Sequence, residues 1–495
     1  MTERENNVVL FPFMAQGHLI PFLALAHRIQ ERTGYTVTYV NTPLNIKKLR
    51  SSLPSNTTIR FAELPFCSAD HGLPPDSENT DVLPYPLIVR LLEASLSLKP
   101  SFKRLLSDIT HQQNGRPPLF IIADMFFGWS AEVADDLGIF HSVFNAGGAY
   151  GMAIYFSMWS HLPHCQTDSP EFLLPDFPEV SVIHRTQLPN NIKYANGTDA
   201  WSRFIQTQVR LWLRSDGLLF NTVEDFDRTG LQYFRRVSGR PVWAIGPTAS
   251  SLTNKTRTDK AAGTTPNQCI EWLDMQPPDS VLYVCFGSQN TISASQMTEL
   301  AIALEASGRN FIWVVRPPVG FDTNSEFRAD DWLPEGFEKR IKAQNRGLLV
   351  RKWAPQVDIL SHRSTSAFLS HCGWNSVTES LSHGVPIIGW PIAADQFYNT
   401  KFLEEEVGVC VEVSRGNECE VRSEHIRSVI ESVMGSETKG AEMRRKARVV
   451  KELIKDAIRY EEGYKGSSVK ALDEFIAMAH AAKKTKKELS NGSSV

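Results

Sequence analysis

Short apolar runs alternate with amphipathic segments along most of the chain, and this alternation is typical of βαβ units with parallel sheets. The runs predict buried strands, and the stretches with a 3.6-residue period predict helices. In the first half the predicted strands are residues 8–13, 35–41, 119–123, 139–145 and 217–221, and the predicted helices are 20–32 and 129–137. This order of elements predicts an α/β fold.

A change of composition then divides the chain. Residues 248–266 are rich in Thr, Ser, Lys and Gly, which predicts an exposed linker. Beyond it the alternation resumes, with predicted strands at 281–286, 310–315, 347–353, 365–371 and 385–390 and helices at 295–307, 375–382 and 440–462. We expect a first domain at 1–247, the linker, a second domain at 267–466, a helix at 467–482 that packs back on the first domain, and a disordered basic tail at 483–495.

The composition excludes several classes of function. Lysine and arginine (52) nearly balance aspartate and glutamate (55), so the chain lacks the positive charge typical of nucleic-acid binding. No run of about 18 apolar residues is present, which argues against a membrane span. The seven cysteines form no CxxC pair and are odd in number, which favours a reducing compartment and a cytoplasmic protein.

The most informative segment runs over the 44 residues from Trp353 to Gln396. Within it, Ser-His-Cys-Gly-Trp-Asn-Ser at 370–376 passes from a strand end through a glycine turn into a helix start. A helix N-terminus offers N–H groups and the positive end of the helix dipole, which suits a diphosphate. Glu379 lies one turn after Asn375 on the same helix face, so its carboxylate can accept hydrogen bonds at the same site.

This segment resembles the signature box of the plant UDP-dependent glycosyltransferases that act on small molecules. Phe286-Gly287-Ser288 before the box and Gly17-His18 near the start extend the resemblance over nearly the whole chain. The resemblance implies a GT-B fold, with two Rossmann-like domains whose parallel sheets face a central cleft. It also implies a UDP-sugar donor that is used without a metal ion.

The resemblance assigns a role to each residue of the donor site. The residues expected at the phosphates are Ser288, His371, Asn375 and Ser376; those expected at uracil and ribose are Trp353, Ala354, Gln356 and Glu379; those expected at the sugar hydroxyls are Trp374, Asp395 and Gln396, the glutamine favouring glucose. Taken singly, a tryptophan at a strand end is usually core and a Ser/Asn pair at a helix start is usually a cap. The GxGxxG fingerprint of nicotinamide enzymes is absent.

Two polar residues follow apolar strands in the first half. His18 stands after the strand 8–13 and just before the first helix, and Asp124 comes directly after the strand 119–123. Ligands of open α/β sheets bind beyond the carboxyl ends of strands, and a helix dipole keeps a nearby histidine neutral. A loop histidine is often structural, and Asp124 can instead cap the following helix. The resemblance implies that His18 is the general base and Asp124 the residue that orients it.

The acceptor is expected beyond the strands of the first half. Candidate residues for this pocket are Phe13, Met14, Phe126, Asn145, Tyr150 and Trp201. Aromatic and methionine side chains are also the usual residues of a core, so this set is open to both readings. Asn145 stands where many members of the family have threonine or serine near the sugar. A pocket of this composition suits a flat or lipophilic small molecule.

We therefore expect an inverting transfer of glucose from UDP-glucose to a hydroxyl of a lipophilic plant metabolite, phenolic or flavonoid first and terpenoid second, to give a β-glucoside. The alternatives are another GT-B UDP-sugar enzyme, such as an epimerase, and an inactive binder of UDP-sugar or metabolite. Asp225 and Asp227 have a metal-type DxD spacing but lie outside the donor half, so neither a metal nor a cofactor is expected. The expected partners are the acceptor and UDP-glucose, with no nucleic acid and no membrane span, and we expect a monomer.

Overall fold

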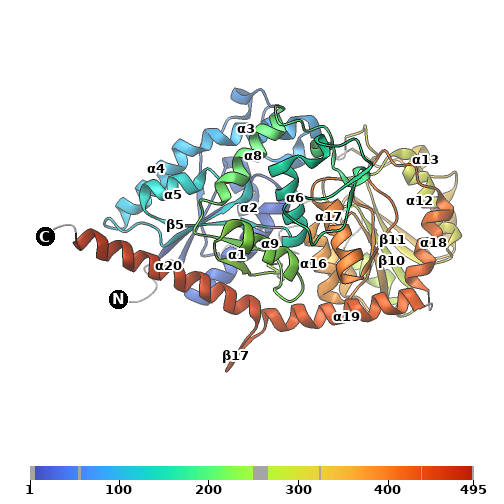
Figure 1. Ribbon diagram of the computed structural model, residues 1–495. Coiled ribbons are helices and arrows are strands. Elements are labelled where there is room, and N and C mark those ends of the chain that lie inside the picture. The colour runs from blue at the N-terminus through green and yellow to red at the C-terminus, as the bar shows by residue number, and fades with distance from the viewer. Residues whose placement is uncertain (1–5, 54–56, 249–265, 323–324, 436–437, 493–495) are drawn as a thin grey trace. The chain divides into compact units, whose positions relative to one another are not determined.

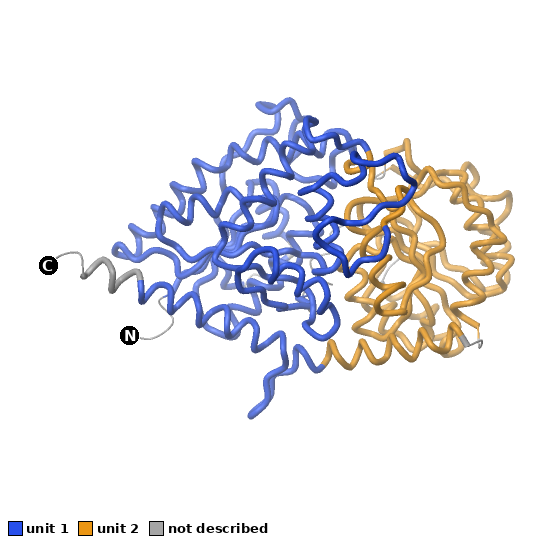
Figure 2. The backbone as a smooth tube through the Cα atoms, viewed as in Figure 1, with its two compact units in different colours: residues 1–182, 194–256, 456–495 blue, residues 183–193, 257–455 orange. Residues whose placement is uncertain are grey.

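The computed structural model of the chain describes residues 6–53, 57–248, 266–322, 325–435 and 438–492 (Figure 1). By its internal contacts the chain forms two compact units, coloured separately in Figure 2. Unit 1 consists of Met1–Val182, Tyr194–Thr256 and Asp456–Val495, and unit 2 of Ile183–Lys193 and Arg257–Lys455. Nearly all of the linker expected at 248–266 lies outside the described residues.

Unit 1 is built on a seven-stranded sheet in the order β3-β2-β1-β4-β5-β8-β9, in which every neighbouring pair is parallel. The strands are β1 Asn7–Phe11, β2 Thr36–Asn41, β3 Arg60–Glu63, β4 Phe120–Asp124, β5 Phe140–Asn145, β8 Gly217–Phe220 and β9 Val242–Ala244. All residues of β1, β4, β5 and β8 are buried, which explains why they form nearly continuous apolar runs. The short β3 and β9 were not predicted, because runs this brief carry little periodicity.

The helices of unit 1 include those predicted after the first strand, after the strand 119–123 and near the C-terminus, together with several that were not predicted. They are α1 Gln16–Thr33, α2 Pro43–Ser52, α3 Ile88–Ala94, α4 Leu98–Gln112, α5 Ser130–Leu137, α6 Ala149–His161, α8 Ala200–Trp212, α9 Arg228–Ser238 and α20 Ser467–Gly492. The short β6 Glu171–Phe172 also belongs to this unit.

The first helix begins earlier than predicted. α1 starts at Gln16 rather than at residue 20, because the N–H groups of His18 and Leu19 both donate to the Ala15 carbonyl at 2.9 Å. Pro21 lacks only one hydrogen bond near the start of the helix, and the helix tolerates it. His18 therefore lies in the first turn of α1 rather than before it, and Asp124 is the last residue of β4 rather than the residue after it.

Unit 2 has a six-stranded parallel sheet in the order β12-β11-β10-β13-β14-β15. Its strands are β10 Val281–Cys285, β11 Asn310–Val315, β12 Gly347–Arg351, β13 Thr365–Ser370, β14 Ile387–Gly389 and β15 Cys410–Glu412. Its helices include α7 Asn190–Lys193, α11 Pro266–Asp274, α12 Ala294–Ala306, α13 Ala329–Trp332, α14 Phe337–Ala343, α15 Gln356–Ser361, α16 Trp374–His383, α17 Gln396–Lys401 and α18 Ser423–Met434. β7 Ile183–His184 and a π-helical turn, Phe402–Val407, also belong to it. Two apolar clusters cover the two faces of the sheet.

The C-terminal part departs from the sequence prediction in two places. The helix expected at 440–462 is α19 Thr438–Ile458, and a hairpin of β16 Tyr460–Glu461 and β17 Tyr464–Lys465 follows it. α20 then continues to Gly492, where a disordered tail was expected from 483, because the lysines and the glutamate of this segment favour a helix. Phe475 of α20 lies 4.9 Å from the ring of Phe120 in β4. No helix in the described part of the chain is long and apolar enough to cross a bilayer.

Candidate active site

The carboxyl ends of β1 and β4 bring His18 and Asp124 together in unit 1. The two strands are parallel neighbours, with Phe11 opposite Ala123, so the residues that follow them emerge at the same edge of the sheet. Nδ1 of His18, in the first turn of α1, lies 2.8 Å from Oδ2 of Asp124. The two residues are 106 positions apart in the chain, and the parallel sheet makes them neighbours.

Asp124 makes both of the contacts considered for it from the sequence: it pairs with His18, and it caps the turn that follows. Its side chain is fully buried, and while Oδ2 meets His18, Oδ1 accepts a hydrogen bond from the Phe126 N–H at 3.0 Å and caps the 3-10 turn Met125–Phe127. A carboxylate only accepts hydrogen bonds, so this contact places the His18 proton on Nδ1 and a lone pair on Nε2. The His18 side chain is 20% exposed, which leaves part of the ring open to a ligand.

Two of the residues proposed for the acceptor pocket lie against His18. The rings of Phe126 and Phe13 have their centroids 5.4 and 5.9 Å from that of the imidazole, and Phe126 is half-buried whereas Phe13 is buried. Met14 is buried, and its carbonyl accepts from the Thr80 N–H at 3.0 Å. His18 is thus bordered by aromatic surface.

The other candidates for that pocket lie in separate clusters. The half-buried Trp201 stacks on Tyr85 at 6.1 Å, and Tyr150 is buried beside Phe177 at 5.7 Å. Asn145, the last residue of β5, is fully buried, and neither polar atom of its amide has a hydrogen-bond partner among the described residues. Burying an amide without hydrogen bonds costs free energy. Asn145 therefore offers unused donors and acceptors at the end of β5, the strand next to the one that carries Asp124.

The DxD pair is engaged inside unit 1. Asp227 is buried, and its carboxylate accepts from the N–H groups of Ala149 and Tyr150 at 2.5 and 2.9 Å, which holds the start of α6. Burial raises the pKa of Asp227 to about 7, although both N–H groups act in the opposite direction. Asp225 pairs with Arg228 at 2.8 Å. No group of three metal-ligating side chains is found among the described residues.

In unit 2, the loops that follow three strands of the parallel sheet contain strained residues. Lys352 after β12, Cys372 after β13 and Ala394 after β14 have φ values of 72°, 60° and 54°, although none is glycine. Residues with such backbone angles cost free energy and cluster at functional sites. Each loop carries residues of the predicted donor site, and Trp353, directly after Lys352, is half-buried rather than a core residue.

A hydrogen-bonded group joins α15 to α16 at this edge. The amide nitrogen of Gln356 donates to Oε2 of Glu379 at 2.7 Å and to the Ser376 hydroxyl at 3.0 Å. The Tyr283 hydroxyl of β10 donates to the other end of the same amide at 3.3 Å. Glu379 is buried and lies on the helix face that the spacing from Asn375 predicted. Sequence reasoning missed Tyr283, which looks like an ordinary strand residue.

His371 lies between two glycines, and both are needed to make room for its ring. A Cβ atom added to Gly287 or Gly373 would come within 2.6 or 2.5 Å of Nε2 of His371. Burial, and secondarily the charge of Arg316, lower the pKa of His371 to about 4, so the imidazole is neutral near pH 7. Its Nδ1 is buried without a partner among the described residues. A neutral imidazole can donate one hydrogen bond.

The start of α16 and the start of α17 carry the remaining donor candidates. Gly373 precedes α16 and supplies no capping side chain to the N–H groups of Trp374, Asn375 and Ser376. Ser288 follows β10 and is exposed. At α17, the amide oxygen of Gln396 accepts from the Ile392 and Ala393 N–H groups, both at 2.9 Å, and Oδ2 of Asp395 accepts from Asn399 at 3.0 Å. Ala354 is buried beside Trp353.

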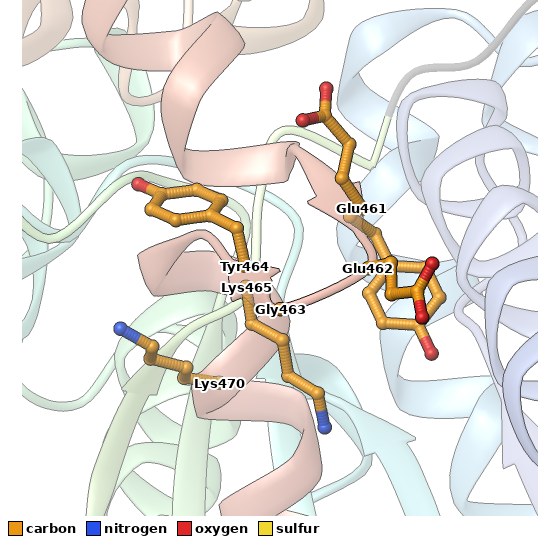
Figure 3. A pocket seen from close by; sticks show the side chains of 7 residues that line it. Glu461, Glu462, Gly463, Tyr464, Lys465 and Lys470 are labelled. Atoms are coloured by element: carbon orange, nitrogen blue, oxygen red, sulfur yellow. The ribbon is translucent and has the colours of Figure 1, made fainter.

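A surface pocket of about 800 Å³ lies elsewhere, at the β16–β17 hairpin of unit 1 (Figure 3). It is lined by Tyr460, Glu461, Glu462, Gly463, Tyr464, Lys465 and Lys470. Lys465 already pairs with Asp473 at 2.7 Å, and the Tyr464 hydroxyl donates to Asp456 at 2.6 Å. None of its lining residues lies at the carboxyl end of a strand of the two parallel sheets, so we do not assign the active site to it.

The chain matches two family models, "Glycosyltransferase, N-terminal domain" over residues 5–250 and "UDP-glucoronosyl and UDP-glucosyl transferase" over residues 255–451. UDP-glycosyltransferase 92A1 of Arabidopsis thaliana is 49% identical and covers 97% of this chain and 98% of its own. Crocetin glucosyltransferase 3 of Crocus sativus is 46% identical, over 88% and 91% of the two chains. UDP-glucose flavonoid 3-O-glucosyltransferase 7 of Fragaria ananassa is 34% identical, over 94% of each.

Solved structures agree with these relatives. A Glycyrrhiza uralensis protein complexed with glycyrrhetinic acid 3-O-monoglucuronide has a TM-score of 0.83 and 30% identity, covering 98% of each chain. A Phytolacca americana protein complexed with UDP-2fluoro-glucose and pterostilbene has a TM-score of 0.76 and 28% identity, covering 96% of this chain and 100% of its own. Two parallel-sheet units with this likeness define a GT-B glycosyltransferase. The chain belongs to the plant UDP-glycosyltransferase family, as its signature box indicated.

Proposed function

We propose that this enzyme transfers glucose from UDP-glucose to a hydroxyl of a lipophilic plant metabolite, with inversion to a β-glucoside. The observation that carries the proposal is the 2.8 Å contact between Nδ1 of His18 and Oδ2 of Asp124. It directs the lone pair of Nε2 to the acceptor, and Asp124 stabilises the imidazolium that forms. An inactive binder would not require a paired base of this kind, and an epimerase would not require the aromatic surface beside it.

In the proposed step, Nε2 of His18 takes the acceptor's proton as the acceptor oxygen bonds to the anomeric carbon. The bond from that carbon to the UDP oxygen breaks on the opposite face, and its electron pair leaves with UDP. The diphosphate gains negative charge, which the neutral His371 and the N–H groups at the start of α16 are suited to stabilise. Glucose as the sugar agrees with Gln396 and with the UDP-2fluoro-glucose bound by the Phytolacca americana protein.

We infer that no metal ion is required. The proposed phosphate-binding groups are neutral donors fixed in place before the donor arrives, so a cation is not needed to balance the developing charge. The acidic pair that has metal-type spacing is already engaged, since Asp227 holds α6 and Asp225 pairs with Arg228.

We propose phenolic compounds, flavonoids among them, as the first class of acceptor and terpenoids as the second. The support is the aromatic surface of Phe126 and Phe13 beside the imidazole, which suits a flat or lipophilic molecule. Relatives are named for flavonoid and crocetin glucosylation, and one solved relative binds a glucuronide of glycyrrhetinic acid. We further propose that the protein is cytoplasmic, because its seven cysteines are free. We also propose that it is a monomer, and light scattering tests its mass.

One assay tests the reaction class. The purified enzyme is incubated with UDP-glucose and a panel of phenols, flavonoids and terpenoid alcohols, and the products are followed by mass spectrometry and NMR. We expect new β-glucosides, with UDP-galactose and UDP-glucuronate giving less product. Conversion of UDP-glucose without an acceptor would indicate an epimerase, and no product of either kind would indicate a binder.

A further inference from the structure

Arg316 stands at the carboxyl end of β11, directly after Val315, in the part of unit 2 to which the donor residues belong. β11 lies between β12 and β10 in the sheet, so Arg316 emerges between the loop of Trp353 and that of Gly287. It is half-buried and lines a small pocket together with Phe286, Gly287 and Asn290. This is the edge of a parallel sheet at which ligands bind.

The guanidinium is held by a single hydrogen bond. Its Nη2 donates to the carbonyl of Lys352 at 3.1 Å, and this is its only hydrogen bond within the described residues. Lys352 has a φ of 72° and directly precedes Trp353, the residue proposed to stack on uracil. The contact therefore fixes Arg316 to a strained turn and limits where its charge can lie.

The positive charge of Arg316 has no counter-ion. Within the described residues no carboxylate forms an ion pair with it. Loss of contact with water lowers the pKa of the guanidinium, and its charge reaches far enough to help lower that of His371. A partly desolvated cation without a partner is costly, and an arriving anion would offset that cost.

We propose that Arg316 is a further donor-binding residue, whose positive charge attracts the diphosphate of the UDP-sugar. The inference rests on the proposed function for the identity of the anion. Three structural observations support it: Arg316 lies at a strand end, it is held by the Lys352 carbonyl, and it lines a pocket together with Gly287. The guanidinium of Arg316 complements the neutral donors near His371, because those donors supply hydrogen bonds but no net charge.

The test compares Arg316→Gln and Arg316→Lys with wild type by titration calorimetry against UDP, UMP and uridine. Arg309→Gln is the matched control, since Arg309 directly precedes β11 at its amino end. We expect Arg316→Gln to weaken UDP binding about tenfold, UMP less and uridine by less than about twofold, since the charge acts on phosphates. Arg316→Lys should recover most of the UDP affinity, and Arg309→Gln should bind all three as wild type does.

Salt and ligand series make the result decisive. The difference between wild type and Arg316→Gln for UDP should shrink as salt rises from about 0.05 to 0.5 M. Equal losses for UDP and uridine would overturn the inference, because they would mean that Arg316 only shapes the turn before Trp353. Unchanged UDP binding in Arg316→Gln would overturn it as well. If wild type bound no UDP, the proposed function itself would fail.

Discussion

The 2.8 Å contact between His18 and Asp124 gives a first prediction at the scale of single residues. Replacing His18 by alanine removes the group proposed to take the acceptor's proton, and we expect transfer to fall about 10²–10⁴-fold. UDP affinity should stay near wild type, because every proposed donor residue belongs to unit 2. Steady-state kinetics and calorimetry with UDP measure the two effects separately.

His27, further along α1, provides the matched control for that variant. His27→Ala removes an imidazole that lies outside the proposed machinery, so turnover should change little. The loss in His18→Ala should also be smaller for acidic phenols than for alcohols, since a phenol needs less help to lose its proton. Equal turnover of His18→Ala and wild type on an alcohol acceptor would rule out His18 as the base.

The buried carboxyl of Asp227 gives a second prediction, on pH. Its folded pKa of about 7 is above the unfolded value of 3.8, so the folded state holds a proton that the unfolded state loses between those values. Its contribution to the free energy of unfolding is therefore largest below about pH 4 and is lost as pH rises through 7. The total loss is at most about 4 kcal/mol. We expect wild type to lose stability relative to Asp227→Asn between pH 5 and 8.

Urea unfolding of both proteins across that range checks the expected slope. Asp225→Asn is the control, because Asp225 is an exposed partner of Arg228, and its curve should run parallel to that of wild type. Parallel curves for Asp227→Asn and wild type would show that the N–H groups of Ala149 and Tyr150 keep the carboxyl ionised and its pKa low.

At the scale of elements, the donor candidates depend on how closely strand ends and helix starts approach. Gly373 precedes α16, and a methyl group there would come within 2.5 Å of Nε2 of His371. We expect Gly373→Ala to displace the imidazole, at a cost of about 1–3 kcal/mol in stability, and to raise the KM for UDP-glucose at least about tenfold. Thermal unfolding and donor kinetics measure the two quantities.

A double variant separates the steric cause from other effects of that methyl group. In Gly373→Ala combined with His371→Ala the clash is absent, so the lost stability should return while donor binding stays weak. If the double variant were less stable than Gly373→Ala, the contact with His371 would not be the cause. Such non-additive effects of two substitutions on stability are typical of residues in direct contact.

Most strands of the two parallel sheets were predictable, because buried parallel strands form apolar runs in the sequence. The same pattern placed His18 and Asp124 near strand ends, although the exact ends of α1 and β4 differed by a few residues. The pattern could not show that Asp124 meets both His18 and the Phe126 N–H, since contacts of a side chain depend on the folded loop. Arg316 could have been proposed from the sequence, because it directly follows the predicted strand 310–315. It was not proposed, because an arginine after a strand is usually a surface residue.

At the scale of the whole molecule, the two units do not follow the order of the chain. Residues 183–193 come from the first half and yet belong to unit 2, where Thr186 accepts from Arg415 at 2.6 Å and Lys193 pairs with Glu418 at 3.5 Å. Residues 456–495 come last and belong to unit 1, where His480 meets the Tyr35 hydroxyl at 2.7 Å. Contacts over more than 200 positions leave no local signal in a single sequence.

Metal independence is a prediction about the whole enzyme, because a required cation would have to bind somewhere in the chain. The proposed phosphate site offers neutral donors and the charge of Arg316, while Asp225 and Asp227 are engaged with Arg228 and with the start of α6. We therefore expect the initial velocity in excess EDTA to equal that in untreated buffer. Added Mg²⁺ or Mn²⁺ should raise it only modestly, by pairing with released UDP. A fall to background that a metal alone restores would contradict the mechanism and make Asp225 and Asp227 the first residues to replace.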